Sequence, residues 1–99
     1  MRHCKGYMVI VKTTINENNR RRTTETILDN KAWKRFGSVC NRIHSIVKNK
    51  CDKHNYRVLY DNLTTNRKDR MHSDIKLVIM RNNYDVVKDY IVRPMQIEI

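Results

Sequence analysis

The clearest alternation of apolar and polar positions lies near the start of the chain, in residues 7–15, which read YMVIVKTTI. Every second residue of this segment falls on one mainly apolar face, made of Tyr7, Val9, Val11, Thr13 and Ile15. Because β-branched and aromatic residues suit a pleated, half-buried surface, the pattern predicts a central β-strand. Residues 23–28, TTETIL, predict a second and shorter strand.

A long amphipathic helix is predicted from about Asn30 to Lys50, with Asp29 or Asn30 placed to cap its first amide groups. Apolar residues recur at steps of three and four and form one face, which contains Trp33, Phe36, Val39, Cys40, Ile43, Ile46 and Val47. We expect this face to pack on the core. The other side carries cations, and no carboxylate lies between Asp29 and Asp52. Because a solvated helix face normally mixes both signs, this face is expected to meet phosphates or acids from elsewhere.

Residues 56–63 and 74–81 predict two further strands, and the dipeptide Asn82-Asn83 predicts a two-residue turn, because asparagine tolerates positive φ. Residues 84–92 fit a short helix as well as a strand, and we favour the strand. The element order is then β-β-α-β-β-β. The sequence therefore predicts one basic α+β domain over residues 1–99, an antiparallel sheet of about five strands packed against one long amphipathic helix.

The charge of the chain narrows the choice of partner. Lys and Arg number 21 against 10 Asp and Glu, which gives a net charge of +11 and an isoelectric point near 10.0. Residues 1–53 hold 13 of the basic and 4 of the acidic residues, so a net +9 lies in the first half. Such a charge repels itself in a compact state, and its usual compensation is a polyanion, with nucleic acid as the leading candidate. The alternative is that a basic isoelectric point only keeps a small protein in solution.

Three groups of cations are the candidate nucleic-acid contacts. The stretch NENNRRRTTET is long for a hairpin connection and predicts a mobile loop that grips phosphates through three adjacent guanidinium groups. The helix and a second basic connection supply the others. The full set is Arg20, Arg21, Arg22, Lys31, Lys34, Arg35, Arg42, Lys48, Arg67, Lys68 and Arg70. Exposed rings among Tyr7, Tyr56, Tyr60, Tyr84 and Tyr90 could stack on bases, although strand tyrosines are more often half-buried.

No base-reading motif is present, so we expect low sequence specificity, with DNA or RNA and single or double strands left open. The predicted protein is not an enzyme and needs no cofactor. Two weaker patterns remain as alternatives. His3, Cys4, Cys51 and His54 could hold zinc if the chain start meets the helix end. Asp61, Asp74 and Lys76 resemble the two carboxylates and the lysine of the PD-(D/E)xK nucleases, in which the carboxylates hold magnesium.

The remaining expectations concern compartment and assembly. No apolar run approaches the roughly 18 residues that a membrane span needs, and three cysteines without framework spacing are typical of a reducing compartment, cytoplasm or nucleus. Asn, Ile and Lys supply 31 of 99 positions, which suggests an AT-rich genome and a viral or microbial source. The alternative function is a structural or interaction subunit of a virion or larger complex. An exposed strand edge could also pair two copies into a homodimer.

Overall fold

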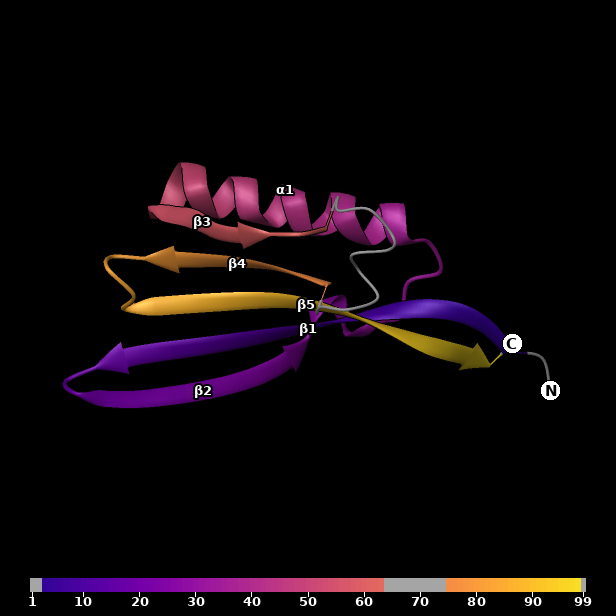
Figure 1. Cartoon of the computed structure of the whole chain (residues 1–99), viewed down its shortest axis with the longest axis horizontal. Helices are drawn as coiled ribbons and strands as arrows, with labels where there is room; N and C mark the ends of the chain where they lie inside the picture. Colours follow the sequence, from indigo (N-terminus) through magenta and orange to yellow (C-terminus); the bar gives the residue numbers. More distant parts are fainter. Residues whose placement is uncertain (1–2, 64–74, 99) are drawn as a thin grey trace.

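In the computed structural model, which describes residues 3–63 and 75–98, five strands form one antiparallel sheet and a helix packs on it (Figure 1). The elements are β1 (His3–Glu17), β2 (Arg20–Ile27), a short 3-10 turn η1 (Leu28–Asn30), α1 (Phe36–His54), β3 (Tyr56–Asp61), β4 (Ile75–Arg81) and β5 (Val86–Glu98). The strand order in the sheet is β2-β1-β5-β4-β3. The predicted α+β class and the β-β-α-β-β-β order are confirmed.

Strand β1 is central, as predicted, because it pairs with β2 on one side and with β5 on the other. Its alternation places Val9 and Val11 in the core, while Tyr7 and Ile15 pack against the core from its edges. The core is completed by apolar side chains from α1, β3, β4 and β5 and by Leu63. Residues 84–92 belong to the turn and to β5, which confirms the strand in preference to the short helix.

The helix begins at Phe36, so the predicted start at Asn30 and the cap at Asp29 or Asn30 are wrong. Asp29 and Asn30 adopt positive φ of 55° and 48°, a conformation that asparagine and aspartate tolerate but that ends regular structure. The chain then runs extended, and the backbone N–H and C=O of Trp33 each bond to Tyr7 at 2.7 Å. Trp33 therefore belongs to this bridge and not to the helix stripe.

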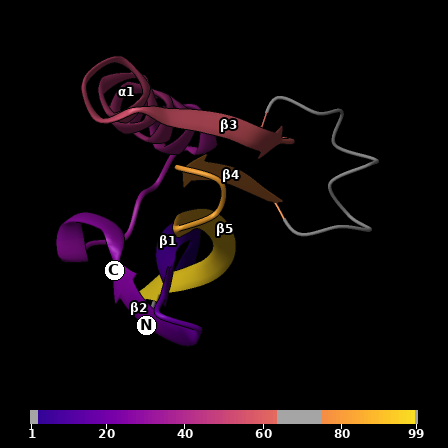
Figure 2. The same ribbon diagram turned by 90° about the vertical axis from the view of Figure 1, so that its left-hand side faces the viewer.

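Helix α1 ends at His54, and the next residue, Asn55, has a positive φ of 60° and donates its N–H to the carbonyl of Lys50. Its buried residues Val39, Cys40, Ile43 and Val47 confirm most of the predicted apolar face. The helix covers one side of the sheet, beside β3 and β4 (Figure 2). We call this the helix side. The opposite side, which no described helix covers, is called the open face.

The turn between β4 and β5 is longer than the predicted two residues. Residues 82–85 form it, and Asn82, Asn83 and Tyr84 all have positive φ. The backbone N–H of Asp85 closes the turn onto the carbonyl of Arg81 at 3.1 Å. Within the described residues, no helix has both the length and the apolar character that crossing a membrane requires.

Candidate nucleic-acid interface

The three adjacent arginines lie in a strand, so the prediction of a long mobile loop at this place is wrong. Asn18 and Asn19 form a two-residue turn, with φ of 50° and 62°, and β2 begins at Arg20. Two consecutive positive φ values are what a tight hairpin of this kind needs, and asparagine supplies them at low cost. The arginines are thus held on a paired two-stranded ribbon that reaches beyond the rest of the sheet (Figure 1).

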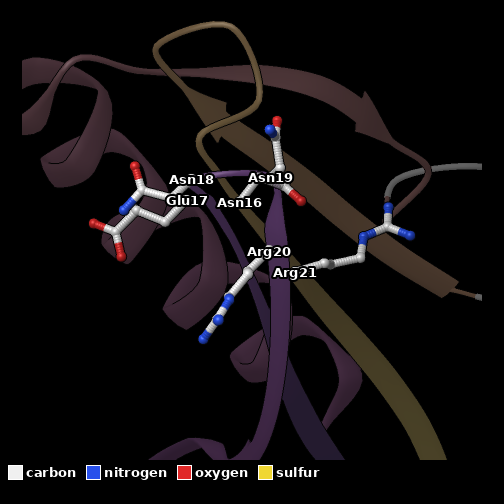
Figure 3. Close-up of a pocket in the computed structure, with 6 residues that line it drawn as sticks. All are labelled: Asn16, Glu17, Asn18, Asn19, Arg20 and Arg21. Atoms are coloured by element: carbon white, nitrogen blue, oxygen red, sulfur yellow. The ribbon is translucent and has the colours of Figure 1, made fainter.

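Strand alternation sends the three side chains to different sides of this ribbon. Arg22 pairs with Ile15, which packs against the core, so Arg22 and Arg20 lie on the helix side. Arg21 pairs with Asn16 on the open face, and Figure 3 shows Arg20 and Arg21 pointing in different directions. All three arginines are exposed, and none forms an ion pair with another described residue.

Asn16 anchors the ribbon to the neighbouring turn. Its backbone N–H donates to the carbonyl of Asp85 at 2.8 Å, and its side-chain amide donates to the carbonyl of Tyr84 at 2.8 Å. The free end of the ribbon is therefore only the short segment around Asn18 and Asn19. Arg21 pairs with Asn16 and Arg22 pairs with Ile15, so two of the three arginines lie beside the anchored part of β1.

The two sides of the ribbon differ in charge. A hollow of about 570 Å³ on the helix side is lined by Glu17, Asn18, Arg20 and Arg22. A hollow of about 420 Å³ on the open face is lined by Lys12, Thr14, Asn16, Arg21, Thr23, Tyr84, Val87 and Asp89. Two cations face one acid on the helix side. On the open face, Lys12 has a carboxylate as its partner in both neighbouring strands, Glu25 in β2 and Asp89 in β5.

The other predicted contacts are spread over the molecule. Lys31, Lys34 and Arg35 are exposed in the extended segment before α1, at the opposite end of β2 from the arginine triplet, and Lys48 is exposed on the helix. The ammonium group of Lys31 lies 3.9 Å from the centre of the Trp33 ring. Arg67, Lys68 and Arg70 lie outside the described residues. The structure therefore does not gather the predicted cations into one patch.

Arg42 is already neutralised by an acid of the same chain. Its Nε donates to Asp29 Oδ2 at 2.9 Å and its Nη2 donates to Oδ1 at 3.3 Å. This hydrogen bonding holds the pKa of Asp29 below its ordinary value and raises the pKa of Arg42. A phosphate at this point would have to compete with Asp29, so Arg42 is the weakest member of the predicted set.

Two of the five tyrosines present enough ring surface to stack on a base. Tyr60 is 45% exposed and Tyr84 is 53% exposed. Tyr56 and Tyr90 are buried in the core, and Tyr7 packs on the Phe36 ring at a centroid distance of 5.4 Å. Tyr84 lines the open-face hollow beside Arg21, where a base and a phosphate could be held together.

The alternative zinc site does not form. His3 and Cys4 begin β1 at one end of the molecule, whereas Cys51 and His54 lie in the last turns of α1 at the other end (Figure 1). Among the residues that the structure describes, no group of three or more His, Cys, Asp or Glu side chains could hold a metal ion. Cys40 is in the core, as expected.

The nuclease-like residues also point apart. Asp61 pairs with the buried Leu77, so it lies on the helix side, where His44 Nε2 is 3.0 Å from its carboxylate. Lys76 precedes Leu77 in β4 and therefore lies on the open face, with its ammonium group 5.8 Å from the centre of the Tyr60 ring. Asp74 lies outside the described residues.

Sequence reasoning missed a second group of cations. Lys50 of α1 and Arg81 of β4 both contact the Tyr56 ring, and Lys88 of β5 lies diagonal to Arg81 on the same helix side. One signal could have found this group. Lys88 occupies an inward-facing position of β5, between the buried Val86 and Tyr90, where a lysine is unusual.

Comparisons with known proteins did not extend these observations, because no protein-family model, no curated protein and no solved structure matched the chain. The interpretation of the site therefore depends on the geometry and charge of its own residues.

Proposed function

We propose that this protein binds nucleic acid with low sequence specificity and holds the phosphate backbone with the basic β1–β2 ribbon and with other exposed cations. The observation that carries the proposal is the arginine triplet at Arg20, Arg21 and Arg22. Three exposed guanidinium groups follow one another on a paired ribbon, and no described acid forms an ion pair with them. Adjacent like charges of this kind are costly unless an anion compensates them, and guanidinium forks match phosphate oxygens.

The shape of the ribbon supports the same proposal. A two-stranded ribbon is narrow enough to lie in a groove of duplex nucleic acid, and it can equally follow the backbone of a single strand. The side chains at its end include arginine and asparagine, both of which can donate to phosphate oxygens, and contacts with phosphates carry no sequence information. Lys31, Lys34, Arg35 and Lys48 would add more distant contacts to a longer ligand.

The test is a titration of the purified protein with single-stranded and double-stranded DNA and RNA at several salt concentrations. We expect affinity to fall steeply with salt, because each neutralised phosphate releases condensed counterions. The key variant replaces Arg20, Arg21 and Arg22 by alanine. A charge-matched control replaces three exposed cations outside the proposed contacts, Lys53, Arg57 and Arg93.

The triplet variant should weaken binding to all sequences alike and reduce the salt dependence, whereas the control variant should change binding far less. Circular dichroism should show both variants folded, because all six side chains are exposed. Flat salt dependence in the wild type would contradict the proposal. An equal loss of affinity in both variants would show that binding depends on the net charge of the protein and not on the arginines of the ribbon.

A second candidate, an interaction subunit that pairs two copies through β2, is favoured by the exposure of that strand. All eight residues of β2 are exposed, and the strand forms one edge of the sheet. An antiparallel pair of β2 strands centred on Thr23 would set Arg21 of one copy opposite Glu25 of the other, twice by symmetry.

Sedimentation analysis of charge swaps tests this pairing. Arg21→Glu alone and Glu25→Arg alone should each dissociate the dimer by placing like charges opposite each other. The double variant Arg21→Glu/Glu25→Arg should restore it. A wild-type protein that sediments as a monomer at all concentrations would refute the second candidate and leave the first untouched.

A further inference from the structure

Two cations from different elements contact one ring near the end of α1, and a third lies on the same side of the sheet, diagonal to Arg81 in the register of β4 and β5. The ammonium group of Lys50 lies 5.5 Å from the centre of the Tyr56 ring, and the guanidinium carbon of Arg81 lies 5.6 Å from the same centre. Lys88 completes the group from β5, where its ammonium group donates to the hydroxyl of Thr13 at 3.2 Å. All three side chains are partly buried, so they are less screened by water than the fully exposed cations of the surface.

The group is not neutralised by the part of the protein that the structure describes. The ion pairs found there, Arg42–Asp29 and His44–Asp61, involve none of its members. The Nε atom of Arg81 is buried and has no acceptor among the described residues. Burial, and then repulsion from Lys50 and Arg81, lowers the pKa of Lys88. The contacts of Lys50 and Arg81 with the Tyr56 ring offset only a small part of the repulsion among the three cations, because a cation–π contact is weaker than an ion pair with a desolvated anion.

We propose that Lys50, Arg81 and Lys88 form a binding site for a phosphate monoester, that is, a terminal phosphate group. A monoester carries a charge of about −2 at neutral pH, which matches three cations better than the single charge of a phosphodiester does. The guanidinium group can donate two parallel hydrogen bonds to two phosphate oxygens, and each ammonium group can donate to another. The hydroxyl of Thr13, which already accepts from Lys88, lies within the same group and can donate to the ligand.

Two sources would supply the same chemistry, a free phosphorylated small molecule or the phosphorylated end of a nucleic acid. The proposal does not depend on the ribbon arginines, since the group lies on α1, β4 and β5. Its failure is therefore distinguishable from a failure of the proposed nucleic-acid binding.

The experiment is a calorimetric and NMR titration of the folded full chain with inorganic phosphate and with pyrophosphate, against sodium chloride at matched ionic strength. Lys50→Gln and Lys88→Met remove one cation each. Lys53→Gln is the matched control, because it removes the same charge from an exposed position in the last turn of the same helix. Unaltered circular dichroism confirms that each variant is folded.

Phosphate should bind the wild type and shift the side-chain ammonium signals of Lys50 and Lys88. Each cluster variant should bind about tenfold more weakly or worse, since each removes a charge-assisted hydrogen bond, and Lys53→Gln should bind as the wild type does. The alanine triplet at the ribbon should leave phosphate binding unchanged. Absence of a response beyond that of chloride would overturn the proposal, as would an equal loss in Lys53→Gln.

A short oligonucleotide with and without a 5′-phosphate separates the two sources. Tighter binding of the phosphorylated form, lost in Lys50→Gln, would assign the site to nucleic-acid ends. Binding of phosphate and pyrophosphate without any effect of the 5′-phosphate would assign it to small phosphorylated molecules. Either result supports the site.

Discussion

Arg20 and Arg22 share the helix side of the ribbon, whereas Arg21 lies on the open face, so substituting these two sets separately shows which side binds phosphates. The comparison uses Arg20→Ala/Arg22→Ala and Arg21→Ala. We expect the double variant to lose binding and the single variant to retain it. The reason is the charge around each set: the two arginines on the helix side face only Glu17, whereas Arg21 lies on a face that also carries Glu25 and Asp89.

The expected magnitude follows from the number of contacts. Each phosphate contact contributes about 0.9 to the slope of log affinity against log salt on duplex DNA and about 0.7 on single strands. Losing two contacts should therefore reduce the slope by about 1.8 on duplex DNA and weaken binding by about 60-fold at 0.1 M salt, with almost no loss at 1 M. The slope of Arg21→Ala should equal that of the wild type.

Fluorescence anisotropy with labelled duplex and single-stranded oligonucleotides, repeated over a salt series, measures both slopes. Thermal unfolding provides the control, because these exposed side chains should contribute little to stability. A larger change in slope for Arg21→Ala than for the double variant would refute the reasoning and place the phosphates on the open face. No change in either variant would remove the ribbon from the interface.

Three further predictions concern stability. Ile43→Ala should lower the free energy of unfolding by about 2 to 5 kcal/mol in urea titrations, because the Ile43 side chain of α1 is fully buried, whereas replacing the exposed Asn41 of the same helix by alanine should cost far less. Asp29→Asn should lower the melting temperature at neutral pH, and this difference should disappear on acidification, because the pKa of Asp29 is depressed in the folded state and its contribution is lost as pH falls through that value. In an ultraviolet titration one tyrosine should ionise only at high pH, because burial raises the pKa of Tyr90 to about 12. The contribution of this neutral tyrosine to stability should be complete below pH 10.0, the ordinary tyrosine pKa, and should be lost as the pH rises toward 12.

The elements that sequence reasoning predicted well are those that bury a periodic apolar face. Val9 and Val11 alternate in β1, and Ile43 and Val47 repeat along α1, so hydrophobic burial alone specifies both elements. Strand β2 could not be recognised from residues 20–22 in this way, because it buries neither face and exists only through its pairing with β1. The informative signal was Asn18-Asn19, which permits a two-residue turn and so extends the pairing to Arg20.

The sequence did not predict the start of the helix or the second cation group, and the physical reasons differ. Trp33 keeps the helical spacing to Phe36, but two residues with positive φ, Asp29 and Asn30, redirect the chain so that Trp33 bonds to β1 instead. Propensity and periodicity do not report such a long-range backbone bridge. The second cation group combines Arg81 and Lys88 of the β4–β5 hairpin with Lys50 of α1, and only the packing of α1 on the sheet brings Lys50 to the other two.

The two proposed anion-binding surfaces lie on the same side of the sheet. Lys88 donates to the hydroxyl of Thr13 in β1. The next helix-side residue of β1 is Ile15, which pairs with Arg22 of β2, and the next helix-side residue of β2 toward the turn is Arg20. Neighbouring positions on one side of a strand are about 6.8 Å apart, so these cations form a line from the end of the ribbon to the group of Lys50, Arg81 and Lys88.

A strand of nucleic acid along this line would place its backbone on the arginines and its terminal phosphate on the group that best matches a dianion. Such contacts involve no base edges, and the acids Glu25 and Asp89 of the open face disfavour the opposite path. The proposed low sequence specificity and a preference for phosphorylated ends would thus both follow from one charged surface.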